Sequence, residues 1–304
     1  MSRIKLFTHT DLDGVGCAVV AHHFFGENVD VAYCDYHNVN GKVSALLDDQ
    51  LALGMYDVIY VTDISVNEEV GERINADVSS MSRIWCLLDH HATAEWMNKY
   101  QWAGVVVESQ GIKRSGTDLF FRWLAGWNYV DGGNIREFVE AVRSYDTWYW
   151  AKTGDQAAKD LNDLFWLIGR DRFVERFTVD PSVALTHTER LLLEIERERI
   201  NAYITGKVRQ LTTHSIGGHT VGIVFADRYQ SELGNHIVTE RADIDFVAMI
   251  DPAKSVSYRT DGKVNVGLFA QIYGGGGHKN AAGSPVSDVV RQTIIESLYG
   301  GAAL

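Results

Sequence analysis

Three side chains that can bind metal ions stand at alternate positions near the start of the chain. The segment FTHTDLDGVG places His9, Asp11 and Asp13 directly after a short apolar run. In an extended backbone, residues at positions i, i+2 and i+4 project to the same side. Two carboxylates in one small volume resist joint ionisation unless cations neutralise them. The spacing therefore predicts part of a metal site.

Three further segments place acidic or imidazole groups directly after apolar structure. Asp63 ends the run VIYVTD, the triplet Asp89, His90 and His91 ends IWCLLDHH, and Asp146 follows the helix-like VRSY. Burying such groups is costly unless they are paired or bound to metal. Taken singly, an aspartate after a strand is more often a helix cap or a turn residue. Because the pattern recurs at several strand ends, we favour a shared site.

The charge of these aspartates indicates how many cations the site takes. Two divalent cations would neutralise the four carboxylates of Asp11, Asp13, Asp63 and Asp146. Mixed aspartate and histidine ligation suits Mn²⁺, with Mg²⁺ or Co²⁺ as alternatives, and the absence of cysteine from the candidate ligands argues against a thiolate-type zinc site. Two ions ~3.5–4 Å apart are the usual arrangement for in-line attack at phosphorus. The pattern predicts a dinuclear hydrolase.

Alternating strand-like and helix-like segments must position these residues. Short runs rich in β-branched and aromatic residues predict strands at 3–8, 29–34, 56–62, 83–88 and 102–107. Helical patterns lie between several of them, at 14–25, 67–77 and 115–125. The alternation predicts an α/β fold with a mostly parallel sheet flanked by helices. In such sheets ligands bind beyond the carboxyl ends of the strands.

The remainder of the chain predicts more helices and then a smaller mixed α/β domain. Helical patterns cover 134–145 and 155–177, and a charged helix over 183–206 looks like a connection. The C-terminal part predicts a hairpin about Gly217-Gly218, a helix at 230–241, a strand at 245–250, a turn at Asp261-Gly262 and a helix near 287–299.

Composition limits the classes of partner and location. The chain has 304 residues and a net charge of −12, which argues against a grip on long nucleic acid through phosphate neutralisation. A short anion held by metal ions remains compatible with that charge. Cys17, Cys34 and Cys86 sit in separate apolar stretches, as expected of reduced, buried residues. Without an apolar run of ~18 residues, we predict a cytoplasmic protein with no membrane partner.

Five ordered motifs resemble those of a known family. HTDLDG, the strand-ending Asp63, DHH and YDT resemble the four N-terminal motifs of the DHH phosphoesterases. GGGGHKNAAG is similar to the signature of their associated C-terminal domain, and HTDLDGVGCAVVA, TDISVNEE, LNDLFWL and SELGN resemble the NrnB-type oligoribonucleases. The resemblance covers nearly the whole chain. It implies a DHH catalytic domain over 1–182, a linker helix over 183–206 and a substrate-binding domain over 207–304.

The resemblance also implies roles for the residues of the first domain, with Asp63 bridging two metal ions. The ligands would be His9, Asp11 and Asp63 for one ion and Asp13, Asp63, His90 and Asp146 for the other. Asp89 would orient an imidazole, as metal-bound histidines usually require. His91 would contact the scissile phosphate, and a metal-activated water would attack phosphorus.

A second group of residues is implied in substrate binding. Consecutive glycines let backbone N–H groups approach an anion closely, although a flexible loop is the alternative, and the following NAAG is compatible with a helix. By resemblance His278 binds phosphate, Arg259 contributes charge or stacking, and Asn235 is a further candidate. The glycines are Gly274, Gly275, Gly276 and Gly277.

Two pairs of residues keep two interpretations each. Trp148 and Trp150 follow Asp146 and could stack on bases, or they could pack in the core. Lys113 and Arg114 could guide a substrate backbone or solvate a loop.

The function predicted is a Mn²⁺-dependent exoribonuclease that trims short oligoribonucleotides, from dinucleotides to about pentanucleotides, to mononucleotides. A homodimer is left open. The alternatives are a 3′-phosphoadenosine 5′-phosphate phosphatase or a phosphodiesterase of linear or cyclic dinucleotides. Inorganic pyrophosphatases share the four N-terminal motifs but not the glycine-rich one. A non-catalytic nucleotide sensor is disfavoured by the intact set of ligand residues.

Overall fold

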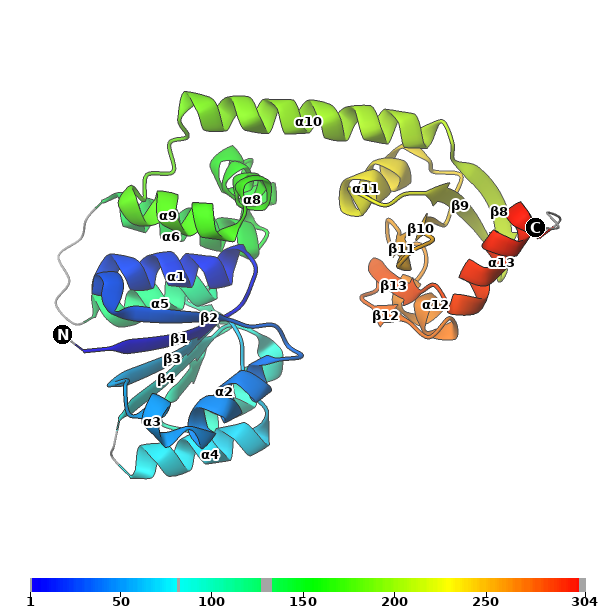
Figure 1. Cartoon of the computed structure of the whole chain (residues 1–304). Helices are drawn as coiled ribbons and strands as arrows, with labels where there is room; N and C mark the ends of the chain where they lie inside the picture. The colour runs from blue at the N-terminus through cyan, green and yellow to red at the C-terminus, as the bar shows by residue number, and fades with distance from the viewer. Residues whose placement is uncertain (1, 81–82, 127–132, 301–304) are drawn as a thin grey trace. The chain divides into compact units, whose positions relative to one another are not determined.

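The structure is a computed structural model that describes residues 2–80, 83–126 and 133–300. By its internal contacts the chain divides into two compact units, Met1–Leu193 and Glu194–Leu304. Each unit, shown in Figure 1, has its own sheet and its own hydrophobic cores. Among the helices of the described chain, none combines the length and the apolar character needed to cross a bilayer.

The first unit is built on a five-stranded, fully parallel sheet with the order β2-β1-β3-β4-β5. Its strands are β1 Ile4–Thr8, β2 Val29–Tyr33, β3 Val58–Thr62, β4 Ile84–Asp89 and β5 Ala103–Val105. All five strands predicted from the sequence are therefore confirmed, and so is the parallel sheet. The final residues Thr8 and Thr62 pair with each other, and Thr62 pairs with Leu88. As a result, the residues that follow β1, β3 and β4 emerge at one edge.

Helices cover both faces of this sheet, as Figure 1 shows. One layer contains α1 Leu12–Phe25, α5 Gly116–Ala125, α6 Asn134–Asp146, α7 Tyr149–Thr153, α8 Gln156–Ile168 and α9 Arg170–Val179. The other contains α2 Val39–Asp48, α3 Gln50–Leu53 and α4 Glu68–Ser79. Short helical turns, η1 Gly26–Asn28 and η2 Ala92–Lys99, and a small hairpin of β6 Glu108–Ser109 and β7 Ile112–Lys113 complete the unit.

The pleat of the strands divides the apolar side chains between the two layers. Leu6 and Tyr60 pack with α1 and α5, whereas the adjacent Phe7 and Val61 pack with α2 and α4. This alternation follows from the period of two along a strand. Both faces are apolar, which is why the strands read as nearly continuous hydrophobic runs.

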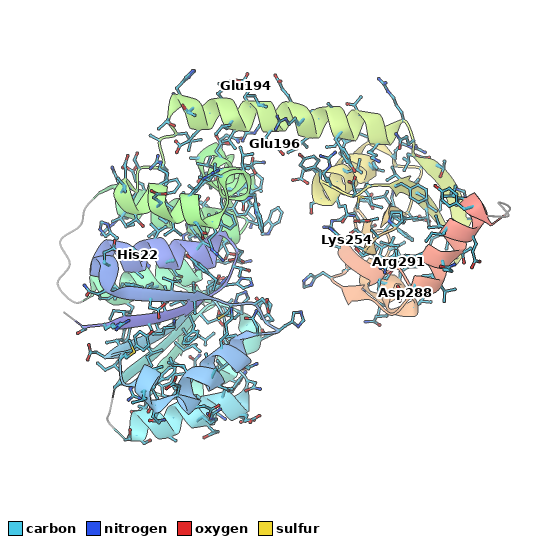
Figure 2. All side chains as sticks on the ribbon, in the orientation of Figure 1. His22, Glu194, Glu196, Lys254, Asp288 and Arg291 are labelled. Atoms are coloured by element: carbon cyan, nitrogen blue, oxygen red, sulfur yellow. The ribbon has the colours of Figure 1, made fainter. Side chains whose placement is uncertain are left out.

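Some helices differ from the sequence prediction. The segment predicted as helical over 155–177 is two helices, because Gly169 between α8 and α9 has a φ of +80°. The helix α2 carries no strong apolar run and was not predicted. His22 lies at the C-terminal end of α1 (Figure 2), where its Nδ1 is 3.1 Å from the carbonyl oxygen of Gly26. It therefore lies at the end of α1 away from Asp13 and bonds to the residue that follows the helix.

The second unit contains a six-stranded mixed sheet with the order β12-β13-β11-β10-β9-β8. The unit boundary falls within α10 His187–Val208. The strands are β8 Thr212–Ile216, β9 His219–Phe225, β10 Phe246–Asp251, β11 Ser255–Arg259, β12 Gly276–Gly277 and β13 Ala281–Pro285. Only β9 and β10 among these pairs run parallel. The helices are α11 Gln230–Glu240, α12 Val266–Ile272 and α13 Asp288–Tyr299.

The predicted hairpin about Gly217-Gly218 is confirmed, and both glycines have positive φ angles. The interpretation of NAAG, residues 280–283, as compatible with a helix is wrong. Ala281 begins β13 and pairs with Arg259 of β11, so inter-strand hydrogen bonding decides the conformation of this short, weakly biased sequence.

The four consecutive glycines have different surroundings. A Cβ on Gly275 would overlap the carbonyl oxygen of Gly283, whereas one on Gly276 would meet no atom within 4 Å. The N–H groups of Gly274 and Gly275 donate to carbonyls of α12, at 3.1 and 2.9 Å. Gly275 is therefore needed for the close approach of the backbone to β13, and Gly276 is not.

This contrast predicts opposite results for two neighbouring substitutions. Gly275→Ala should destabilise the second unit by about 1–3 kcal/mol because its methyl group collides with the backbone, while Gly276→Ala should leave stability nearly unchanged. All eight tryptophans lie in the first unit. Calorimetry and far-UV circular dichroism should therefore show a lowered transition for Gly275→Ala that tryptophan fluorescence does not report. Equal melting curves for the two variants would contradict this packing.

Candidate metal centre

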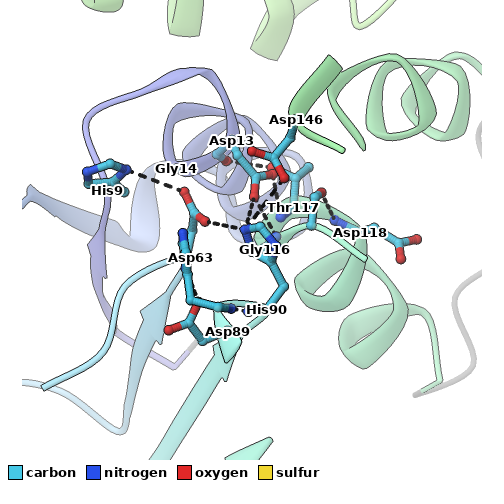
Figure 3. Close-up of polar contacts among 12 residues, drawn as sticks. His9, Asp13, Gly14, Asp63, Asp89, His90, Gly116, Thr117, Asp118 and Asp146 are labelled. Atoms are coloured by element: carbon cyan, nitrogen blue, oxygen red, sulfur yellow. Dashed lines mark hydrogen bonds and ion pairs between the residues drawn. The ribbon is translucent and has the colours of Figure 1, made fainter. Parts of the chain in front are cut away.

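The carboxyl edge of the parallel sheet brings the acidic and imidazole side chains together (Figure 3). His9 follows β1, Asp63 follows β3, and His90 follows β4. Because β1, β3 and β4 are neighbours in that order, these residues meet although they are far apart in sequence. Asp146 arrives at the same place as the last residue of α6.

The three N-terminal residues converge by a different backbone path from the predicted one. The extended conformation expected over 9–13 is wrong, because β1 ends at Thr8 and α1 begins at Leu12. Asp11 caps α1 by accepting a hydrogen bond of 3.1 Å from the N–H of Gly14. A Cβ at Gly14 would collide with the backbone of His9. This glycine therefore permits the sharp strand-to-helix turn that gathers the side chains.

One group of donor atoms lies around His9. Its Nδ1 is 2.8 Å from Oδ2 of Asp11 and 3.8 Å from Oδ2 of Asp63. The Nδ1 of His9 and the Oδ2 of Asp63 are both buried, and neither makes a hydrogen bond. Buried polar atoms are normally satisfied. Two unsatisfied atoms, 3.8 Å apart and beside the Asp11 carboxylate, fit the ligands of a cation.

A second group surrounds His90. Its Nε2 lies 3.5 Å from Oδ2 of Asp13, 3.2 Å from Oδ1 of Asp63 and 3.5 Å from Oδ2 of Asp146. Asp63 thus presents one carboxylate oxygen to each group. Within each of the sets His9–Asp11–Asp63 and Asp13–His90–Asp146, the potential ligand atoms lie within 4.8 Å of one another. Oxygen and imidazole donors in this arrangement fit two neighbouring divalent cations.

Burial and crowding raise the pKa of two aspartates. Burial, followed by the charges of Asp13 and Asp11, raises the pKa of Asp63 well above its ordinary value. The same causes raise the pKa of Asp146 to about 8. Burial alone would also raise the pKa of Asp11, but the His9 imidazole and the Gly14 N–H hold it below its usual value. Without cations, burial and mutual repulsion therefore disfavour the charged forms of Asp63 and Asp146.

The start of α5 holds Asp13 in place, and sequence reasoning missed this contact. The N–H groups of Gly116 and Thr117 donate to the two carboxylate oxygens of Asp13, at 2.5 and 2.9 Å. A Cβ on Gly116 would collide with Asp63. The capping residue Ser115, which accepts from the N–H of Asp118, was the available signal, since an S-x-x-D pattern marks a helix start with free N–H groups for an anion.

Asp63 itself has a strained backbone. Its φ angle is +56°, which is uncommon for a residue other than glycine. Such strain persists where the surroundings enforce it, and it is concentrated at functional sites. Here Gly116 packs against Asp63, and the N–H of Asp63 donates to the carbonyl of Leu88 at 3.0 Å. The strain directs the carboxylate between the two donor groups.

The remaining members of the cluster form a chain of hydrogen bonds. His91 donates from Nδ1 to Asp89 at 2.7 Å, and Ser65 donates to the other oxygen of Asp89 at 2.5 Å. The Asp89 carboxylate raises the pKa of His91. The Nε2 of His91 lies 3.3 Å from the hydroxyl of Tyr36, whose ring also packs at 5.1 Å from the ring of His9. Sequence reasoning missed Tyr36, which lies in a loop without a motif.

Residues predicted to bind substrate lie in the second unit. Arg259, the last residue of β11, donates to the hydroxyl of Ser231 at 3.1 Å. Ala281 pairs with Arg259, and its carbonyl accepts a hydrogen bond from the N–H of His278. The turn that contains His278 therefore lies at the same end of β11 as Arg259. Asn235 is exposed on α11. These residues share one unit, but they belong to a different unit from the candidate metal ligands.

Arg114 has neither of its two predicted roles. It is 6% exposed and forms an ion pair of 3.1 Å with Asp118. It therefore stabilises the start of α5 and neither solvates a loop nor presents a free charge. Its neighbour Lys113 is exposed on β7.

Comparison with known proteins adds a relative in sequence and one in structure. Oligoribonuclease NrnB from Bacillus subtilis (strain 168) is 35% identical over 302 residues, which cover 97% of this chain and 75% of that protein. A solved structure described as the pGpG-specific phosphodiesterase PggH from Vibrio cholerae has 13% identity and a TM-score of 0.56 over 97% of both chains. That likeness shows a shared fold. No protein-family model matches the chain.

The raised pKa of Asp146 predicts how stability depends on pH. An aspartate whose folded pKa exceeds its unfolded value favours folding at low pH, and that contribution is lost as pH rises to the folded value of about 8. Asp146→Asn should therefore melt roughly 2–5 °C above the metal-free wild type at pH 8, with a smaller difference at pH 5. Added Mn²⁺ should stabilise the wild type much more than the variant.

The matched control is Asp171→Asn, which changes a carboxylate that is 87% exposed and should shift melting little in either condition. Thermal melts after chelator treatment, with and without Mn²⁺, provide the measurement. If metal-free Asp146→Asn were no more stable than the wild type at pH 8, the electrostatic account of the cluster would be wrong.

Proposed function

Because the chain belongs to the NrnB-like DHH phosphoesterases, we propose that it is a metal-dependent exoribonuclease that hydrolyses short oligoribonucleotides to mononucleotides. The relative whose similarity shows this membership is named an oligoribonuclease. Dinucleotides to about pentanucleotides are the proposed substrates. The net charge of −12 supports short substrates, because a long polyanion would be repelled wherever metal ions do not hold it.

One observation carries this proposal. Asp63, only 1% exposed, shares its two oxygens between the His9 group and the His90 group. A carboxylate buried between two sets of metal-binding side chains fits a pair of divalent cations, which we propose to be Mn²⁺. When bound, such a pair supplies activation of water and neutralisation of charge on a phosphodiester.

We propose that the first cation is held by His9, Asp11 and Asp63, and the second by Asp13, Asp63, His90 and Asp146. The backbone N–H groups of α5 fix the Asp13 carboxylate in orientation before any cation arrives. The buried Nδ1 of His9 makes no hydrogen bond, so this nitrogen is available as a metal ligand. Residues of the chain thus preorganise the site, so that binding costs little reorganisation.

His91 is proposed to contact the scissile phosphate. Its Nδ1–H is held by Asp89, which also favours the cationic imidazole. In the cationic imidazole the Nε2–H is also a donor, and it lies on the side of the ring near the Tyr36 hydroxyl. A cationic donor at this place can hydrogen-bond a phosphate oxygen and stabilise the negative charge that grows on it during the reaction.

The substrate-binding roles of the second unit remain part of the proposal. Arg259 and His278 supply a cation and a hydrogen-bond donor for a phosphate, at the same end of β11. Of the four glycines, Gly274 and Gly276 are those at which an added Cβ would meet no atom within 4 Å, so their surroundings have free space for a ligand. We propose that this region holds the part of the oligonucleotide that is not cleaved, together with Asn235.

Activity on matched substrates tests the function. Chelated protein reconstituted with Mn²⁺ should cleave a 5′-labelled diribonucleotide faster than 3′-phosphoadenosine 5′-phosphate, a cyclic dinucleotide or pyrophosphate. Asp63→Asn should lower kcat/KM by more than roughly 100-fold, since even residues that only orient metal ligands contribute 10–100-fold. Asp171→Asn should retain wild-type rates.

The preferred substrate separates the alternative functions. A preference for 3′-phosphoadenosine 5′-phosphate would replace the oligoribonuclease by a phosphatase, and binding of dinucleotide without turnover would indicate a nucleotide sensor. Equal activity of Asp63→Asn and the wild type would remove the proposed metal centre from the mechanism.

A further inference from the structure

A column of three aromatic rings rises from the core to the surface where α6 ends and α7 begins. The rings of Tyr145 and Trp150 are stacked at 5.8 Å and 12°, and those of Trp150 and Trp148 at 6.0 Å and 29°. Tyr145 and Trp150 pack against the main core of the first unit. Trp148, the outermost ring, is 65% exposed. The column therefore ends in an indole surface that protein atoms cover only in part.

Trp148 has a backbone conformation that is unfavourable for a residue with a side chain. Its φ and ψ angles are +60° and +17°, in the left-handed region where glycine or asparagine is favoured. The turn is held by the N–H of Trp148, which donates to the carbonyl of Tyr145 at 3.1 Å. Glycine would occupy this position without strain. Backbone stability therefore does not explain a tryptophan here, whereas a need for its ring does.

The ring is attached next to the candidate metal centre. Asp146, two residues earlier, places Oδ2 at 3.5 Å from Nε2 of His90. Two residues span at most about 7 Å of backbone, so the Cα of Trp148 lies within that distance of the Cα of Asp146. A phosphodiester at the metal centre carries a nucleoside on each side. A planar base on one of these nucleosides is thus the natural partner for an uncovered indole.

We propose that Trp148 is a stacking platform for the nucleobase next to the scissile phosphate, supported from behind by Trp150 and Tyr145. This inference rests on the proposed function, because it takes the substrate to be an oligonucleotide. The stack contributes affinity and no chemistry, and it accepts every base because each has a flat aromatic face. Purines, which offer the larger face, are preferred at this position.

The test measures whether Trp148 and a base interact. The probes are a fluorescent diribonucleotide with a methylenephosphonate linkage, which cannot be hydrolysed, and two analogues that each lack one base. With Mn²⁺ present, Trp148→Ala should weaken binding of the complete probe about 5- to 150-fold, the range of one base–aromatic stack. It should not weaken binding of the analogue that lacks the stacked base. Trp148→Phe should retain part of the affinity.

Two variants control for folding and for loss of any exposed tryptophan. Trp148→Gly relieves the left-handed strain, so its melting temperature should stay close to that of the wild type while its affinity falls. Trp166, in the last turn of α8, is 68% exposed and belongs to neither group of candidate metal ligands. Trp166→Ala should bind all three probes like the wild type.

The outcomes distinguish this inference from the proposed function. If Trp148→Ala binds the complete and base-lacking probes with the same loss, or with none, the stacking platform is wrong even when the wild type cleaves dinucleotides. If the wild type binds the probe but cleaves no dinucleotide, the exonuclease proposal fails, and the Kd comparison still decides the role of Trp148. If the wild type fails to bind the probe at millimolar concentration, both are overturned.

Discussion

Crowding of negative charge at one edge of a parallel sheet is the constraint on which the first unit depends. Asp63 and Asp146 are buried near Asp11 and Asp13, and the resulting desolvation and repulsion raise the pKa values of the first two. An arrangement of this kind makes the metal-free fold less stable than one with neutral side chains. It is therefore explained by the cations that it can bind, and the surrounding structure must hold it against its own repulsion.

Some polar atoms of the cluster have hydrogen-bond partners, and others are buried without one. Asp13 is met by two backbone N–H groups of α5, and Asp89 is met by His91 and Ser65. Such groups are hydrogen-bonded as buried carboxylates usually are. Nδ1 of His9 and Oδ2 of Asp63 are buried without a hydrogen bond. These two atoms are therefore the candidates for binding a cation, within a cluster in which the carboxylates of Asp13 and Asp89 are already held by hydrogen bonds.

Glycine serves the same physical purpose in both units, which is close approach. Gly14 lets α1 begin directly against His9, Gly116 lets α5 pack on Asp63, and Gly275 lets the backbone pass against β13. In each case a methyl group would displace the backbone that carries or borders a proposed functional residue. The exceptions in the glycine-rich segment are Gly274 and Gly276, whose surroundings leave room for a bound molecule.

The sequence by itself determined the five strands of the parallel sheet and the identity of the clustered side chains, because apolar runs ending in Asp or His are local patterns. It did not reveal Tyr36 or the N–H groups of Gly116 and Thr117, which reach the cluster only after folding. It also misjudged the backbone over 9–13 and the strand at Ala281. These features depend on contacts between residues up to about a hundred positions apart. Short-range pattern contains no information about such contacts, so only the tertiary structure decided how the site is held.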